Sequence, residues 1–293
     1  MVVIKRILCP VDFSVVSERA LVHAAAFAMW HEAALTTLFV SPATDGPVPA
    51  GQTDAGQFDE QKLTAFFPAA AGASGAVRPR VTSGSVVTEI LRVAAEMPAD
   101  LIIMGTHGTS GFKRLVLGSV TEKVLRSSLC PVVTVPPGVN HHAAEPVAFR
   151  TVLCAVDFSD SSTRALEYAV SLARKAGGRL ALLHVLEWFA EEREEPIAGS
   201  DDTTIPTSEQ DARAQLEALL TSDARACDPE LIVGYGAPHA EVLRLVRERQ
   251  VDLVVLGVQG RNVLDRTLFG STTQRVVRDA RCLVLTVRSL GKP

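Results

Sequence analysis

"KRILCPVDFS" (Lys5–Ser14) decides the fold, because the chain repeats it as "RTVLCAVDFS" (Arg150–Ser159). Six of the ten positions are identical in the two stretches. Each is an apolar run that ends at an aspartate, which is typical of a buried strand followed by a turn. A chain of 293 residues that carries this strand twice is expected to hold two copies of one domain.

Two further pairs of stretches follow in the same order. "ADLIIMGTHG" (Ala99–Gly108) matches "VDLVVLGVQG" (Val251–Gly260), and "GSVTEKVLRSSLCPVVTV" (Gly118–Val135) matches "GSTTQRVVRDARCLVLTV" (Gly270–Val287). The segment between the copies is rich in proline, glycine and small residues, as linkers are. We therefore predict domains over residues 1–138 and 150–293, joined by a linker at 139–149.

Apolar strand runs alternate with helical patterns in both copies. In the second copy a helix is expected after a cap near Ser161 and up to a stop at Gly177, and another single helix over residues 208–226. This alternation predicts an α/β fold of two tandem Rossmann-like domains, each with a five-stranded parallel sheet flanked by helices. Ligands of such sheets bind beyond the carboxyl ends of the strands, where the strand order reverses.

The composition excludes several classes of protein. A net charge of -4 and a pI near 6.0 do not indicate a nucleic-acid partner. No apolar run reaches the roughly 18 residues of a membrane span, and a secretory signal is not expected. The five cysteines are scattered, which favours reduced thiols and a cytoplasmic location. Cys130 and Cys282 are interpreted as core thiols, with redox sensors as the alternative.

A glycine pattern follows the fourth predicted strand in both copies. It reads Gly105-x2-Gly108-x9-Gly118-Ser119 in the first and Gly257-x2-Gly260-x9-Gly270-Ser271 in the second. The first two glycines permit positive φ and let a ligand approach the backbone, and the last opens a helix whose first N–H groups can hold phosphate oxygens. Hydroxyl groups can add donors at Ser119, Thr121, Ser271, Thr272 and Thr273. The alternative is a tight turn followed by a helix cap.

An aspartate ends the first predicted strand of each copy. Asp12 and Asp157 can accept hydrogen bonds from a base amino group or from ribose hydroxyls, or they can cap the following helix. Pro10 and Val11, together with Val40 and Met104, can wall a purine or simply pack in the core. Neither a P-loop pattern nor a GxGxxG pattern after the first strand is present.

With these motifs the chain resembles the universal stress protein family in its tandem two-domain form. The family's fold implies the strand order 3-2-1-4-5 in each sheet, and the glycine spacing resembles that of its ATP-binding branch. Carried onto this chain, the family's nucleotide site corresponds to Pro10, Val11, Asp12, Val40, Met104, Gly105, His107, Gly108, Gly118, Ser119, Val120 and Thr121 in the first copy. In the second it corresponds to Ala155, Val156, Asp157, Val185, Leu256, Gly257, Gly260, Gly270, Ser271, Thr272 and Thr273.

The second copy departs from the first at three of the corresponding positions. Ala155 replaces Pro10, Val258 replaces Thr106, and Gln259 replaces His107. The glycines that shape the backbone remain, so binding is expected there as well, on weaker grounds.

The resemblance implies an ATP-binding stress-response module in which nucleotide occupancy changes a partner surface, with Mg²⁺ accompanying the phosphates. No catalytic residue and no metal site are expected. A slow ATPase, with His107 as a base, and an adaptor without nucleotide function are the alternatives. The resemblance also implies an intramolecular pseudo-dimer through the fifth strands and a homodimer of the whole chain, since exposed strand edges seek cover.

Overall fold

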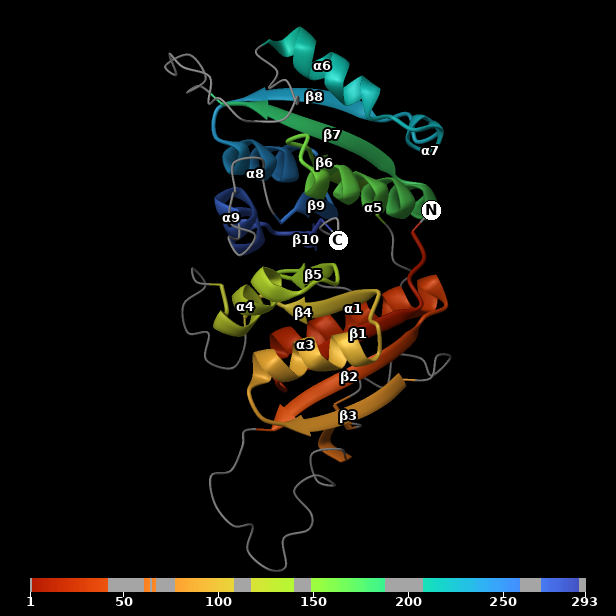
Figure 1. Cartoon of the computed structure of the whole chain (residues 1–293), viewed down its shortest axis with the longest axis vertical. Helices are drawn as coiled ribbons and strands as arrows, with labels where there is room; N and C mark the ends of the chain where they lie inside the picture. The colour runs from red at the N-terminus through yellow and green to blue at the C-terminus, as the bar shows by residue number, and fades with distance from the viewer. Residues whose placement is uncertain are drawn as a thin grey trace, which may run out of the picture. The chain divides into compact units, whose positions relative to one another are not determined.

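The computed structural model describes residues 2–41, 61–63, 65–66, 77–107, 117–139, 149–187, 208–258 and 270–289. The chain divides into two compact units (Figure 1). One is Val3–Val147, here called the first half; the other is Ala148–Pro293 together with Met1–Val2, here called the second half. The division between 147 and 148 falls inside the segment predicted as the linker.

The first half is built around five parallel strands in the order β3-β2-β1-β4-β5. Its elements are β1 (Arg6–Val11), α1 (Val15–His31), β2 (Ala34–Ser41), β3 (Val77–Ser83), α3 (Val86–Glu96), β4 (Leu101–Gly105), α4 (Ser119–Ser127) and β5 (Val132–Val135). The apolar run of β4 is almost completely buried, with Leu101, Ile102 and Ile103 at most 1% exposed. Such burial on both faces is what a parallel sheet covered by helices requires.

The second half repeats this arrangement with the strand order β8-β7-β6-β9-β10. Its elements are β6 (Thr151–Ala155), α5 (Asp160–Ala176), β7 (Arg179–Leu186), α6 (Glu209–Ala218), α7 (Ser222–Arg225), β8 (Glu230–Tyr235), α8 (Pro238–Glu248), β9 (Leu253–Gly257), α9 (Ser271–Asp279) and β10 (Leu283–Val287). The α/β fold is confirmed, and the order 3-2-1-4-5 holds within each half.

The helices of each half lie on opposite faces of its sheet. The chain moves from β1 to β2 in one direction along the sheet and from β3 to β4 in the other, so right-handed crossovers place α1 and α3 on opposite faces. Helix α3 contacts α4 in the first half, and α8 contacts α9 in the second (Figure 1). The strand order therefore reverses between β1 and β4, and the sequence predicts a ligand at the carboxyl ends of these strands.

Two details of the predicted helices differ in the structure. The cap of α5 is Ser159, whose hydroxyl accepts from the Ser162 N–H, two residues before the predicted position. The predicted stop is confirmed, because Gly177 has a φ of 63° at the C-cap. The single helix expected over residues 208–226 is wrong: Thr221 starts a new helix by accepting from the Ala224 N–H, which separates α7 from α6.

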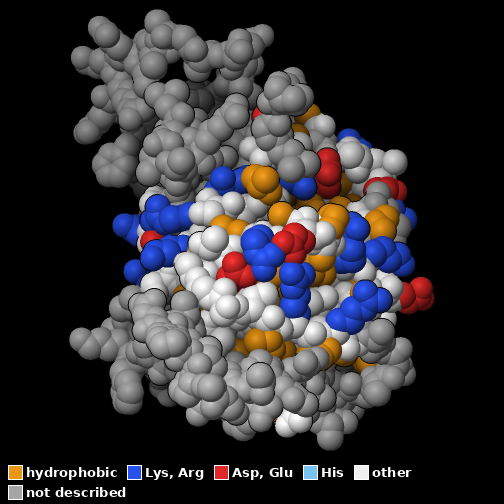
Figure 2. Space-filling model, turned by 60° about the horizontal axis from the view of Figure 1, so that its bottom comes forward, with side chains coloured by type: hydrophobic (Ala, Val, Ile, Leu, Met, Phe, Trp, Pro, Cys, Tyr) orange, Lys and Arg blue, Asp and Glu red, His pale blue; other side chains and the backbone are white. Residues whose placement is uncertain are grey.

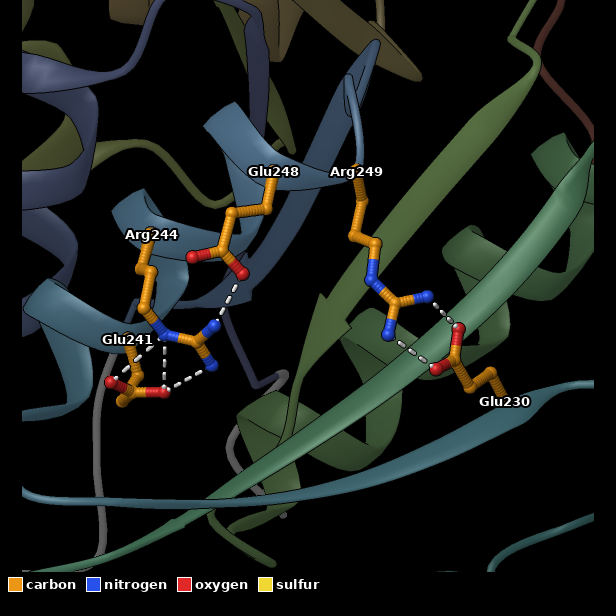
Figure 3. A network of polar contacts seen from close by, with 5 residues as sticks. All are labelled: Glu230, Glu241, Arg244, Glu248 and Arg249. Atoms are coloured by element: carbon orange, nitrogen blue, oxygen red, sulfur yellow. Dashed lines mark hydrogen bonds and ion pairs between the residues drawn. The ribbon is translucent and has the colours of Figure 1, made fainter.

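Ion pairs connect α8 to β8 and α3 to β3, and further ion pairs form within each of these two helices. In the second half Arg249, just after α8, makes two hydrogen bonds of 2.8 Å to Glu230 of β8, and Arg244 lies between Glu241 and Glu248 (Figure 3). The first half repeats the pattern on α3. On the face drawn in Figure 2, charged side chains of both signs lie next to one another. Because these groups are exposed or only half-buried, solvent screens them and their effect on stability is modest.

The cysteines separate into two classes. Cys9, Cys154 and Cys282 are buried, whereas Cys130 and Cys227 are half-buried. Burial raises the pKa of Cys282 to about 12 and raises the pKa values of Cys9 and Cys154 even more strongly. Cys282 is therefore a core thiol as predicted, although both it and Cys130 lie just before the fifth strands rather than within them.

We expect Cys9, Cys154 and Cys282 to react with a thiol reagent at least tenfold more slowly in the native protein than in denaturant. The thiolate is the reacting species, and burial disfavours it. Labelling followed by peptide mass mapping measures each site separately. Cys130 and Cys227 are expected to be modified first, and rapid native labelling of Cys282 would contradict its assignment to the core.

Within the described residues, no helix is both long enough and apolar enough to cross a bilayer.

Candidate nucleotide-binding site

The candidate site lies at the carboxyl ends of the first and fourth strands of each half. In the first half β1 and β4 are neighbours, and they end at Val11 and Gly105. Helices α1 and α4 begin at the same edge of the sheet. The order of the strands reverses between β1 and β4, so this edge is the place where a doubly wound sheet accommodates a ligand.

Both aspartates of the site organise the turn into the first helix. Oδ1 of Asp12 accepts from the N–H of Ser14 at 3.1 Å and from its hydroxyl at 2.6 Å. The same Ser14 hydroxyl oxygen accepts from the Ser17 N–H and so caps α1. Asp157 and Ser159 repeat these contacts at the same distances, 3.1 and 2.6 Å. The helix caps are therefore Ser14 and Ser159, and each aspartate supports the cap by holding its serine rather than capping the helix itself. A ligand role for the aspartates remains a prediction.

The residue after each aspartate adopts a left-handed backbone. Phe13 has a φ of 61° and Phe158 a φ of 63°, a region that non-glycine residues rarely enter. The Phe13 ring lies 4.6 Å from the ring of Phe39 and 5.2 Å from that of Phe66, with the Lys62 ammonium 4.4 Å from its centroid. In the second half the Phe158 ring lies 4.6 Å from His184. These aromatic contacts hold the turn in its unfavourable conformation.

Sequence reasoning missed these aromatic residues as part of the site. The only signal was the phenylalanine in both "VDFS" stretches, and a bulky residue does not indicate positive φ.

The glycines that end β4 and β9 are required for close packing. A Cβ at Gly105 would lie 2.7 Å from Cγ1 of Val16, and one at Gly257 would lie 2.5 Å from Oγ of Ser161 and 2.8 Å from the Ser162 nitrogen. Neither glycine uses the positive φ that the residue type permits, since neither is among the positive-φ glycines of the described residues. They let the first helix of each half approach the strand end. Gly108 and Gly260 lie outside the described residues.

In each half, a glycine is the N-cap of the helix whose N-terminus lies at this edge of the sheet. Gly118 is the N-cap of α4 and Gly270 that of α9, and neither helix has a side-chain cap. The Gly118 N–H donates to the Thr106 carbonyl at 2.9 Å, and the Gly270 N–H donates to the Val258 carbonyl at 3.1 Å. These bonds fix the first turn against the strand end. The N–H groups of the next three residues in each helix then carry the positive end of the helix dipole.

Two of the predicted hydroxyl donors are used within the protein. The Thr121 hydroxyl donates to the Gly105 carbonyl at 2.8 Å, and the Thr273 hydroxyl donates to the Gly257 carbonyl at 2.9 Å. Both threonines are 4% exposed. In this structure both hydroxyl protons are used on these carbonyls, and a ligand role for the two hydroxyls stays a prediction. Their role is to lock the helix start onto the strand end, which leaves their backbone N–H groups for a ligand.

The remaining predicted residues lie at or beside the same edge. Those that are buried are Pro10, Val11, Val40, Met104, Val156 and Leu256. For the first four, core packing was the alternative interpretation. Half-buried or exposed residues lie at the strand ends and helix starts: His107, Ser119, Val120, Ala155, Val185, Ser271 and Thr272. His107 Nδ1 lies 2.9 Å from the hydroxyl of Thr106. Val258, which replaces Thr106 in the second half, is 3% exposed.

The comparisons with known proteins agree with this arrangement. The universal stress protein family matches residues 4–136 and 148–288. A universal stress protein of Mycolicibacterium smegmatis is 27% identical over 297 residues, covering 96% of both chains. The crystal structure of a universal stress protein from Archaeoglobus fulgidus DSM 4304 is 26% identical, with a TM-score of 0.67, and covers 97% of this chain and 98% of its own.

One half of the chain also matches a universal stress protein whose crystal structure is a complex with cAMP. That protein is 25% identical with a TM-score of 0.36, over 49% of this chain and 99% of its own. The family matches both repeats and together these matches cover most of the chain. This protein therefore belongs to the universal stress protein family and carries two of its domains in tandem.

Proposed function

We propose that each half of the protein binds an adenine nucleotide, ATP in the first instance, at the edge formed by the first and fourth strands. The observation that carries this proposal is the start of α4 and of α9. In both helices a glycine without a side-chain cap turns the first N–H groups toward the carboxyl end of the sheet. Uncapped N–H groups at a helix N-terminus suit phosphate oxygens, because they combine hydrogen-bond donors with the positive end of the dipole.

The backbone of the helix start supplies the phosphate contacts in this proposal. Ser119, Val120 and Thr121 donate through their N–H groups in the first half, and Ser271, Thr272 and Thr273 do so in the second. The Ser119 and Ser271 side chains are exposed and can add hydroxyl donors. Within the described residues there is no group of three or more acidic, histidine or cysteine side chains fit to hold a metal. Mg²⁺ would therefore arrive with the triphosphate.

The base and the ribose would lie toward β2 and β7. Asp12 and Asp157 stand at the ends of β1 and β6, where a carboxylate can accept from ribose hydroxyls while Oδ1 keeps its contacts to the serine. Val40 and Val185 stand at the end of the neighbouring strand. Nucleotide bound there would change the surface offered to a partner, which would make the protein a regulatory module.

The strand edges support a proposal about assembly. β5 and β10 are apolar strands, "VVTV" and "LVLTV", at the end of the five-strand order of each half. Edge strands of this kind seek a partner. We propose that the fifth strands pair the halves as a pseudo-dimer, that the chain forms a homodimer, and that it acts in the cytoplasm. Sedimentation equilibrium measures the oligomeric state.

The nucleotide proposal is tested on freshly purified protein. Native mass spectrometry is expected to show a mass increase that corresponds to one or two adenine nucleotides, and calorimetric titration of stripped protein is expected to show ATP binding. Chromatography of the titrated nucleotide reports hydrolysis separately from binding. No affinity at millimolar ATP in the stripped protein, together with no co-purified nucleotide, would reject the proposal in favour of an adaptor role.

A further inference from the structure

The two halves differ at one residue that lies against the turn of the candidate site. Phe39 of β2 and His184 of β7 occupy equivalent positions, since each packs on the phenylalanine that follows the aspartate. The ring centroids are 4.6 Å apart and the planes are inclined by 43° in both pairs. The two side chains thus fill the same space, but only His184 carries hydrogen-bonding nitrogens.

The imidazole of His184 uses one nitrogen on the main chain. Nδ1 lies 2.8 Å from the carbonyl oxygen of Val156. A carbonyl can only accept, so Nδ1 carries the proton. His184 is 8% exposed and Val156 is 3% exposed. A buried carbonyl needs a donor, and in the second half this imidazole provides one.

In the first half the equivalent carbonyl is that of Val11, and it accepts a main-chain hydrogen bond of the sheet. The pairing of β1 with β2 runs to Val11↔Phe39, whereas the pairing of β6 with β7 ends at Ala155↔Leu183. The Val156 N–H still donates to the Leu183 carbonyl at 2.8 Å, so the second half loses only the last bond of the ladder. That bond would run from the Val185 N–H to the Val156 carbonyl, and it is absent from the described main-chain contacts. The Val156 carbonyl, which would accept that bond, accepts from the His184 side chain instead.

The direction of the Val185 main chain follows from its neighbour. The Leu186 carbonyl accepts from the Gly236 N–H at 2.9 Å, so the polar groups of Leu186 face β8. Successive residues of a strand alternate in direction, so the N–H and C=O of Val185 face the side of β6. β6 has already ended there, beside Asp157. Val185 therefore presents a donor and an acceptor at the base side of the candidate site.

We propose that His184 is a positioning residue that makes the two nucleotide sites unequal. By donating to Val156, it leaves the Val185 N–H for an acceptor nitrogen of the base, whereas in the first half the ladder consumes the N–H of Val40. The second site then binds ATP more tightly than the first. This inference rests on the proposed function, and its structural part can be measured without nucleotide.

The structural part is tested by hydrogen exchange of single amides in the nucleotide-free protein, followed by NMR. His184→Phe copies the first half and is expected to slow exchange of the Val185 amide at least tenfold, because the ladder can then close. His184→Asn is the matched control: its side-chain NH₂ takes the place of Nδ1 and should keep exchange at the original rate. Phe39→His is the reciprocal change and should speed exchange of the Val40 amide. Equal exchange of Val185 in the original protein and in His184→Phe would overturn the inference.

The functional part is tested by ATP titration of the second site with the first site blocked by Ser119→Glu. His184→Phe is expected to weaken binding about three- to tenfold, which is the effect of one hydrogen bond, and His184→Asn is expected to restore it. Thermal unfolding of each variant confirms that it is folded. If His184→Phe is not folded, Phe39→His decides the question through a gain in ATP affinity of the first half, measured with the second site blocked by Ser271→Glu instead of Ser119→Glu. Unchanged ATP affinity in a folded His184→Phe variant refutes the positioning role.

The two proposals can fail separately. If Val185 exchange responds as expected but no variant binds ATP, the proposed function fails while the His184 arrangement stands. If ATP binds but the exchange rates do not respond, the nucleotide function stands and the inference about His184 fails.

Discussion

The double variant Ser119→Glu/Ser271→Glu is expected to weaken ATP binding at both sites by at least tenfold, or about 1.4 kcal/mol per site. Both serines are exposed at the first position of their helices, so the longer side chains meet no packed neighbour. A carboxylate there repels the phosphates that the helix start would attract. The same charge interacts favourably with the helix N-terminus, so the fold should be stabilised by about 0.3–1 kcal/mol rather than weakened. Calorimetric titration and thermal unfolding measure the two effects.

The control for this experiment is Ser119→Gln/Ser271→Gln. Glutamine has the shape of glutamate without its charge, so ATP affinity should stay within about threefold of the original. A second control, Gly138→Glu, adds a carboxylate at an exposed glycine with no atom near its Cβ position. If Ser119→Glu/Ser271→Glu binds ATP as well as the glutamine variant, the phosphates do not lie at these helix starts and the proposed site is wrong.

Gly257→Ala is expected to destabilise the second half by about 1–3 kcal/mol, the usual effect of overpacking. The new methyl group would lie 2.8 Å from the Ser162 nitrogen and 2.9 Å from the Ser161 carbonyl carbon, both main-chain atoms of α5. Main-chain atoms of a helix cannot move without moving the helix, so α5 must shift away from β9. Chemical denaturation followed by circular dichroism measures the loss.

Gly105→Ala is the matched change in the first half and should cost less. The nearest atom to its Cβ is Cγ1 of Val16, a side-chain methyl at 2.7 Å, and the nearest main-chain atoms are 3.4 Å away. A methyl group can rotate away, and Val16→Ala would remove the contact altogether. The expectation is therefore a smaller loss for Gly105→Ala, recovered in part by Val16→Ala. A larger loss for Gly105→Ala than for Gly257→Ala would show that the two helices do not constrain these glycines as described.

The sequence alone predicted much of the candidate site because the site coincides with the points where strands end. Asp12 with Asp157 and Gly105 with Gly257 mark those ends in both repeats, and parallel strands bring their carboxyl ends to one edge. What each residue does there could not be predicted. Thr121 was predicted to be a possible ligand donor, and in the structure its hydroxyl donates to the Gly105 carbonyl, because a hydroxyl bonds whichever acceptor the fold brings close.

The repeated motifs and the periodicity of apolar residues in the sequence by themselves determined the architecture of this protein. They predicted two α/β halves, the parallel strands, and a helix with a glycine N-cap at each candidate site. These features depend on neighbours in sequence and on the alternation of apolar runs. Tertiary structure alone decided that Gly105 and Gly257 serve packing, that Phe13 and Phe158 are held at positive φ, and that His184 ends a strand pairing. Each depends on an atom brought from a distant segment: Val16 or Ser161 against a glycine, Phe39 against Phe13, and the Val156 carbonyl against an imidazole. Distances between such atoms are set only when the chain packs, so no local pattern in the sequence can report them.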